Sequence, residues 1–401
     1  MNKDIGRGMS SRIAQLILIT TACLAAIAAT DIFLPSLPQI AIYFSATDNK
    51  AQLAIPLFLF GQLLGAPLWG ILSDRIKRNR IILLGLAIFL LGTVICIFSG
   101  SIDIFLTGRF LQGLGAIVGP VVGWAIIQDL YPKDEAAKIM TWVGGILIVG
   151  PIIAPSIGGY IDVTFGWKVS FWVIAILVFS CIVGAATIKT ASDRVKKSKL
   201  SLLETFKTYA TILSHKKFLS YASLYAVLIS GITCYLTVIP FYFEKSLDMN
   251  PESTGIYMAL AGAGYILGTF ITNYFLKHHG VDKAIAWGVG LALLGGLLLL
   301  TTGFILPTFP TIIAGSMGVL FVGESLIWSS ATSRALQCFS ENQGAASAVR
   351  SIVVMSFITF GGLMGSALDD LTLVPMATFI MMTAVAALII FNTKTLREDR
   401  R

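Results

Sequence analysis

Two pairs of opposite charges lie inside apolar stretches of this 401-residue sequence. Asp31 follows 18 uncharged residues that begin after Arg12, and Arg109 lies within another apolar stretch. Glu324 and Arg350 occupy two further stretches in the C-terminal part of the chain. A charged side chain inside a lipid bilayer costs about 2.5–3.5 kcal/mol or more, so residues of this kind commonly bind substrates, ions or protons. We therefore treat these four residues as the first candidates for a functional site.

Proton coupling is the chemistry that the first pair can perform. Counting along the expected helices places Asp31 and Arg109 roughly 10 Å and 9 Å below the same outer face, at 1.5 Å per residue. Burial favours the protonated form of a carboxyl group, whereas a nearby arginine favours the ionised form. We expect the two residues to pair or to compete for one proton, so that the site takes up and releases a proton in each cycle. The alternative is a static ion pair that holds two helices together.

The second pair could bind a substrate. Glu324 and Arg350 are expected roughly 18 Å and 10 Å from the inner ends of their helices. We expect a second embedded pair that faces the cavity. A free Glu324 would bind a cation or a proton, and a free Arg350 would favour a carboxylate, because its guanidinium group matches that geometry. Tyr235 and Trp328 are candidates for an aromatic cavity lining that takes apolar cations, although packing or lipid contact would explain them equally.

The composition places these charges in a membrane. Hydrophobic residues make up 56% of the chain and charged residues only 12%, with a mean hydropathy of +0.84. Soluble domains carry about 25% charged residues. Twelve apolar runs of about 20 residues predict an all-α polytopic membrane protein with twelve transmembrane helices in two six-helix halves. The runs are 13–37, 51–72, 81–100, 103–128, 138–161, 167–188, 218–243, 253–276, 283–305, 308–336, 343–367 and 372–392.

The basic residues predict the orientation. With both termini in the cytoplasm, 24 of the 29 Lys and Arg residues fall on the cytoplasmic side. Only Lys50, Lys168 and Lys245 fall outside, and two arginines are embedded. This asymmetry is the positive-inside pattern, so we expect a multi-pass protein of the inner (cytoplasmic) membrane. The net charge of +8 therefore records topology and gives no reason to expect a nucleic-acid partner.

One long hydrophilic stretch divides the chain. We expect an N-terminal six-helix bundle over 1–188, a cytoplasmic linker over 189–217 and a C-terminal six-helix bundle over 218–401. The rear of the linker places leucine and aromatic residues at helical spacing, which predicts an amphipathic helix along the membrane surface. Two six-span halves suggest a cavity between them, and such a cavity needs no second copy of the chain, so we expect a monomer.

Three stretches carry a resemblance to the major facilitator superfamily that covers essentially the whole chain. "GILSDRIKRNR" at 70–80 resembles the signature between spans two and three, and "LTGRFLQGLGA" at 106–116 resembles that of span four. "GPIIAPSIGGY" at 150–160 resembles the antiporter signature of span five. The resemblance implies that Gln112 joins Arg109 in the proton and substrate site. It also implies gating roles for Gly70, Asp74, Arg75, Arg78, Gly150, Pro151, Pro155, Gly158 and Gly159.

Within this superfamily the chain resembles the drug:proton antiporters of the Bcr/CflA, or bicyclomycin-resistance, type. The likeness is in "TDIFLPSLPQI", which closes span one, and in "QGAASAV" at 343–349, which opens span eleven. Arg350 follows the second stretch where an uncharged residue is expected, and Glu324 is also outside the family pattern. These two departures concern the substrate and leave the expected fold unchanged.

The sequence therefore predicts a proton-coupled exporter of multiple drugs or small amphipathic compounds that works by alternating access. Export of an endogenous metabolite such as a polycarboxylate siderophore is the first alternative, and a proton-coupled uptake symporter is the second. A membrane sensor or membrane enzyme would need a soluble domain or a catalytic cluster, and neither is evident. The sequence shows no phosphate-binding glycine loop and no metal-ligand spacing, so we expect no enzyme activity, cofactor or metal. The expected partners are the small-molecule substrate, protons and the lipid bilayer.

Overall fold

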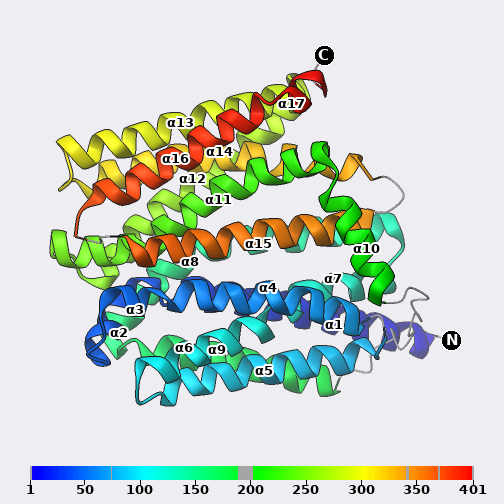
Figure 1. Ribbon diagram of the computed structural model, residues 1–401. Coiled ribbons are helices and arrows are strands. Elements are labelled where there is room, and N and C mark those ends of the chain that lie inside the picture. Colours follow the sequence, from blue (N-terminus) through cyan, green and yellow to red (C-terminus); the bar gives the residue numbers. More distant parts are fainter. Residues whose placement is uncertain (1, 74, 188–201, 340–342, 369–370, 400–401) are drawn as a thin grey trace.

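A computed structural model describes residues 2–73, 75–187, 202–339, 343–368 and 371–399. Asp74, one of the predicted gating residues, lies outside these described residues. Twelve membrane-spanning segments are present in the described part of the chain, as the sequence predicted. The helices that precede residue 188 form the first half (Figure 1). They are α1 Asn2–Asp31, η1 Leu34–Ser36, α2 Leu37–Tyr43, α3 Asp48–Gln52, α4 Ala54–Ser73, α5 Arg78–Phe98, α6 Ile102–Ala116, α7 Val118–Leu130, α8 Lys133–Phe165 and α9 Lys168–Thr187.

The second half follows a short helix, α10 Leu202–Leu213, which lies in the expected linker. Its helices are α11 Lys216–Phe241, η2 Tyr242–Ser246, α12 Pro251–His278, α13 Val281–Ile305, α14 Pro310–Gln337, α15 Gln343–Ala367, α16 Leu373–Phe391 and α17 Lys394–Asp399. Figure 1 shows the two halves side by side, with both ends of the chain at the same end of the bundle. We call that end the terminus end, and the opposite end, which holds η1, α2 and α3, the far end.

Span one is broken inside the membrane-spanning segment. The helix α1 ends at Asp31, and the chain then passes through the single turn η1 into α2. Pro35 and Pro38 cause this break, because proline has no backbone N–H to donate to the helix ladder and restricts the residue before it. A charged residue, Asp31, therefore lies at the C-terminal end of α1.

The break also lengthens span one. The segment runs from Ile13 to Tyr43, and not to residue 37 as the sequence suggested. Counted from Tyr43, Asp31 therefore lies roughly 18 Å from the end of this segment at 1.5 Å per residue, whereas the expected depth of roughly 10 Å was counted from the end near residue 37. Span four begins at Ile102, so the Cα of Arg109 lies roughly 10 Å below the same end. The long arginine side chain has to cover this difference in depth.

The two halves meet along two pairs of helices. The helix α8 packs against α12, and α4 packs against α15. The segments η1, α2 and α3 add contacts with α11, α12 and α15, and all three segments lie at the far end. The side-chain contacts described below also join the halves at that end.

Matching ion pairs tie the helices of each half together at the terminus end. In the first half, Arg78 of α5 pairs with Asp129 of α7 at 3.2 Å. In the second half, Arg334 of α14 pairs with Asp282 of α13 at 2.5 Å. The third and fourth spans of each half are thus linked in the same place, but the acid and the base have exchanged helices. This correspondence fits two related six-helix units.

Candidate functional site

Arg109 is the most completely enclosed charge of the first half. Its side chain is 0% exposed, and its guanidinium group contacts two aromatic rings, 4.1 Å from the Phe33 ring centre and 4.4 Å from that of Phe58. Cation–π contacts of this kind gain strength when water is excluded. The rings come from span one and span two, so Arg109 joins three helices at one point.

Backbone carbonyl groups accept most of the hydrogen bonds from this guanidinium. Arg109 Nε donates to the Ala54 carbonyl at 3.2 Å, and Nη1 donates to the Ala29 carbonyl at 2.9 Å. Nη1 also donates to Gln112 Oε1, and Gln112 Nε2 in turn donates to Thr93 Oγ1 at 3.0 Å. The structure thus brings Arg109 and Gln112 together, as the motif implied, and ties both to span one.

Asp31 lies close to Arg109 but does not pair with it. The Asp31 side chain is buried, with 6% of the residue exposed, and the two charges are electrostatic neighbours. Among the described residues we find no ion pair or hydrogen bond to the Asp31 carboxylate, and Arg109 Nη2 is buried without a partner. The direct ion pair expected from the sequence is therefore absent in this state. A carboxyl group without a bound cation inside a membrane protein is a place where a proton can bind.

The span-five motif packs directly against the segment that carries Asp31. A Cβ atom added at Gly158 would collide with the carbonyl oxygen of Ile32, the residue after Asp31, and one at Gly150 would lie 2.8 Å from the Ile27 side chain. Only glycine permits this approach of two backbones. Pro151 and Pro155 lie inside α8, which is continuous across them. The motif therefore leaves the helix unbroken and fixes the distance between span five and the segment that carries Asp31.

The same motif also forms the contact between the halves. A Cβ atom at Gly159 would collide with the Pro251 carbonyl of α12, and one at Gly255 would collide with the Pro155 carbonyl of α8. Ser156 Oγ donates to the Gly255 carbonyl at 3.1 Å. Movement of α12 relative to α8 would thus be transmitted to the backbone around Asp31.

Glu324 is the buried carboxylate of the second half. It is 3% exposed on α14, and its Oε1 accepts a hydrogen bond from the Tyr225 hydroxyl of α11 at 3.1 Å. The Tyr225 ring contacts the Trp328 ring, with their centres 4.5 Å apart. Tyr265 on α12 is a further electrostatic neighbour of this carboxylate.

Arg350 reaches the same group of residues from α15. Its guanidinium lies 4.6 Å from the centre of the Trp328 ring. Its Nε is buried without a partner, and no hydrogen bond from this guanidinium is found within the described ranges. No ion pair joins Arg350 to Glu324 there either, so the second embedded pair expected from the sequence does not form directly. We call Tyr225, Glu324, Trp328 and Arg350 the second-half cluster.

The other predicted residues are more dispersed. Tyr235 is 0% exposed within the hydrophobic core, and its hydroxyl has no partner among the described residues. A Cβ atom added at Gly70 would contact only the Val121 side chain, so this position is not tightly packed. Arg75 is exposed at the terminus end. Arg78 is buried in its ion pair with α7 of the same half, so it links helices within one half and not across the two. No metal-binding cluster occurs among the described residues.

Polar contacts close the far end between the halves. Gln39 Nε2 donates to Glu244 Oε1 at 2.8 Å, and Asn49 Nδ2 donates to the Ser366 carbonyl at 2.8 Å. Lys245 of η2 pairs with Asp48 of α3. Each contact joins a residue of the first half to one of the second half.

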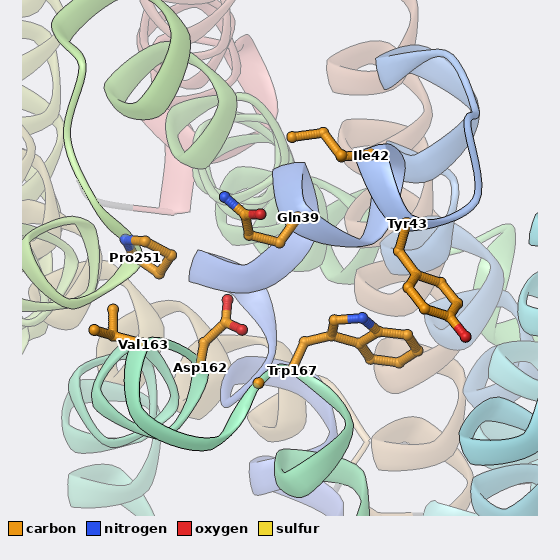
Figure 2. Close-up of a pocket in the computed structure, with 8 residues that line it drawn as sticks. Gln39, Ile42, Tyr43, Asp162, Val163, Trp167 and Pro251 are labelled. Carbon is orange, nitrogen blue, oxygen red and sulfur yellow. The ribbon is translucent and has the colours of Figure 1, made fainter.

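A pocket of about 490 Å³ lies beside these contacts. Its walls include Gln39 and Tyr43 of α2, Asp162 of α8, Trp167 and Pro251. Figure 2 shows Asp162 and Trp167 on one side of the pocket and the α2 residues on the other. The pocket is separate from both Arg109 and the second-half cluster, because none of those residues contributes to its wall.

Sequence reasoning missed several of these partners. The carbonyl groups of Ala29 and Ala54 give no signal in a sequence, because every residue carries a carbonyl group. Phe33 and Phe58 are two of 25 phenylalanines, and nothing in their spacing marks them as neighbours of Arg109. Tyr225 could have been noticed as a polar aromatic residue within an apolar span, the same signal that pointed to Tyr235.

A broken span, embedded charges and two six-helix halves together define a polytopic membrane transporter. The chain belongs to the Major Facilitator Superfamily, whose family model matches residues 19–362 and 223–400. Its members are transporters and not enzymes, so the expectation that the chain is no enzyme is confirmed.

Curated relatives match most of the chain. It is 26% identical over 370 residues to the uncharacterized MFS-type transporter YdgK of Bacillus subtilis (strain 168), with 90% of each chain covered. It is 28% identical over 335 residues to the multidrug resistance protein MdtL of Escherichia coli (strain K12 / DH10B), with 81% of each covered.

Solved structures share the fold. A partially occluded inward-open structure of the xylose transporter XylE from E. coli matches with a TM-score of 0.74 at 14% identity, covering 96% of this chain and 98% of that one. A mutant of the nucleoside transporter NupG matches with a TM-score of 0.73 at 12% identity, covering 94% and 99%. These likenesses confirm the twelve-helix fold.

Proposed function

We propose that this protein exports small amphipathic compounds across the cytoplasmic membrane in exchange for protons. The observation that carries the proposal is the position of Asp31. It is a buried carboxylate at the C-terminal end of α1, where span one is broken, beside Arg109 but without a direct partner among the described residues. Transporters of this architecture commonly place coupling ions at such broken helices. The relatives named as multidrug resistance proteins support drugs as the exported compounds.

Alternating access would connect Asp31 to both sides of the membrane. With the terminus end in the cytoplasm, contacts at the far end would close the outer side, so this state would face inward. Opening the far end would separate α8 from α12 and shift the backbone that Gly158 supports next to Ile32. Asp31 would then exchange its proton with the outer solution. Inward proton movement would supply about 2.3 kcal/mol per charge for a 100 mV potential and about 1.4 kcal/mol per pH unit.

The proposal is tested by substrate-induced collapse of a pH gradient in everted membrane vesicles. Lipophilic cations, neutral drugs and carboxylate siderophores are added in turn to vesicles that contain the wild type or Asp31→Asn. We expect at least one amphipathic compound to collapse the gradient with the wild type and to have no effect with Asp31→Asn. A compound that is transported without moving the gradient, and equally well by both proteins, would refute proton coupling at Asp31.

A second candidate function is export of a polycarboxylate siderophore. Arg350 favours it, because its guanidinium has no acceptor among the described residues and would donate hydrogen bonds to a carboxylate. The same vesicle assay separates the two candidates by the compound that collapses the gradient. The uptake symporter is the third candidate, and an increase of the pH gradient would identify it, because substrate and proton would enter the vesicle together.

A further inference from the structure

The second-half cluster contains two opposite charges that do not neutralise each other directly. Glu324 accepts from the Tyr225 hydroxyl, whereas the guanidinium of Arg350 lies on the Trp328 ring. Arg350 Nε is buried with no acceptor in the described part of the chain. A charged group removed from water is unfavourable unless another charge or hydrogen bond compensates it. Arg350 therefore offers a donor to an anionic group, and Glu324 offers an acceptor to a cationic one.

Two aromatic rings connect these charged groups through contacts, because Arg350 lies on the Trp328 ring and Tyr225 donates to Glu324. The rings of Tyr225 and Trp328 lie 4.5 Å apart at an angle of 59°. Tyr225 and Glu324 are buried, with 8% and 3% exposed, whereas Trp328 and Arg350 are partly exposed. A ligand would therefore meet Trp328 and Arg350 first and reach Glu324 last.

We propose that the second-half cluster binds flat amphipathic zwitterions, with the carboxylate on Arg350, the ring system along Trp328 and the cationic nitrogen at Glu324. The inference rests on the proposed function, because it names the substrate class of the same transporter. Bidentate contact with a carboxylate suits the planar guanidinium of arginine. Neutralising both charges at once gives such a ligand an advantage that neither a cation nor an anion has.

The cluster also disfavours the neighbouring classes of compound. A second carboxylate on a polyanionic ligand would be repelled by Glu324, and a simple cation would be repelled by Arg350. Specificity obtained from repulsion of the wrong ligand is common in binding sites. This reasoning distinguishes the zwitterion from the polycarboxylate siderophore considered above.

Three related compounds test the inference directly. Norfloxacin carries a carboxylate and a cationic piperazine on a flat ring system, its methyl ester is a cation, and nalidixic acid is an anion. Equilibrium dialysis measures their binding to the full-length protein in lipid nanodiscs, without a proton gradient. We expect norfloxacin to bind at least about tenfold more tightly than both other compounds, since each factor of ten corresponds to 1.4 kcal/mol.

Two charge-removing variants should change this preference in opposite directions. Glu324→Gln should weaken binding of norfloxacin and its ester but strengthen that of nalidixic acid, because the repulsive carboxylate is gone. Arg350→Gln should weaken the binding of norfloxacin and nalidixic acid but strengthen the binding of the ester, because the repulsive guanidinium is gone. Glu135→Gln and Lys283→Gln, which remove exposed charges outside the cluster, should leave all three affinities unchanged. Opposite changes cannot result from a general loss of folding.

The outcomes separate this inference from the proposed function. Norfloxacin binding with the stated preference, but no gradient collapse in vesicles, would leave the inference standing and refute proton-coupled export. The zwitterion assignment is overturned if either singly charged compound binds as tightly as norfloxacin, or if none of the three compounds binds to the wild type. It is also overturned if both variants lose affinity for all three compounds to the same extent.

Discussion

At the residue scale, Arg109 shows why a planar guanidinium is needed where a point charge would not suffice. Two of its nitrogens donate to carbonyls on different helices, those of Ala54 and Ala29, while the guanidinium also contacts two aromatic rings. A lysine ammonium group has no flat face and cannot follow the fork of the guanidinium. The role of Arg109 is therefore to hold spans one and two against span four next to Asp31.

We predict that Arg109→Lys keeps the positive charge but loses function. Loss of one charged hydrogen bond should destabilise the fold by about 2 kcal/mol, and export should fall by about tenfold or more because the segment carrying Asp31 loses its anchor. Thermal unfolding in detergent and export from everted vesicles measure the two effects. Lys283→Arg, at an exposed position, serves as the control. Unchanged export by Arg109→Lys would show that the charge alone is sufficient.

At the element scale, α8 combines two functions along its length. Its part around Gly158 and Gly159 contacts the backbones of span one and α12, where an added Cβ has no space. Its part around Gly144 and Gly145 has no neighbouring atom within 4 Å of the corresponding Cβ positions. Glycine is therefore required by packing at one end of this helix only.

This difference gives a matched pair of variants on one helix. Gly158→Ala should destabilise the protein by about 1–3 kcal/mol through overpacking, and it should reduce export because span five is pushed away from Ile32. Gly144→Ala should leave stability and export near the wild-type values, or raise stability slightly, because alanine is the better helix former. Thermal unfolding and vesicle export of the two variants provide the comparison. Equal effects of both substitutions would contradict the packing role assigned to Gly158.

At the scale of the whole molecule, the described contacts close one end of the interface between the halves. Asn49 and Ser366 lie on opposite sides of that interface and are joined by a hydrogen bond of 2.8 Å. If the halves move apart at the far end in each transport cycle, a covalent link at this place must stop transport.

We therefore predict that the double variant Asn49→Cys/Ser366→Cys, cross-linked by oxidation or by a short thiol-reactive linker, loses export. Addition of a reductant to the oxidised protein should restore export to at least about half of the uncross-linked rate, since reopening a disulfide restores the original chain. Cys23, Cys96, Cys181 and Cys234 are buried, and the single variants control for the remaining reactivity. Full export by the cross-linked protein would show that the far end does not open.

The sequence alone determined the architecture of this protein. Twelve apolar runs, each long enough to cross a bilayer, predicted the twelve spans, because the backbone polar groups of a membrane segment must be satisfied within helices. The sequence motifs also drew attention to the glycines of α8, which lie in tight contacts, and to Arg109 and Gln112, which share a hydrogen bond. Length and apolarity are local properties, so they can be read without knowledge of the tertiary structure.

Only the tertiary structure decided how the embedded charges are paired. The sequence suggested Asp31 with Arg109 and Glu324 with Arg350, because opposite charges in a membrane are expected to meet. Instead, Arg109 is bound by backbone carbonyls and aromatic rings, Arg350 lies on the Trp328 ring, and Glu324 accepts from Tyr225. Backbone acceptors are present at every position and aromatic rings at many, so the packing of distant helices selects which of them meet a charge.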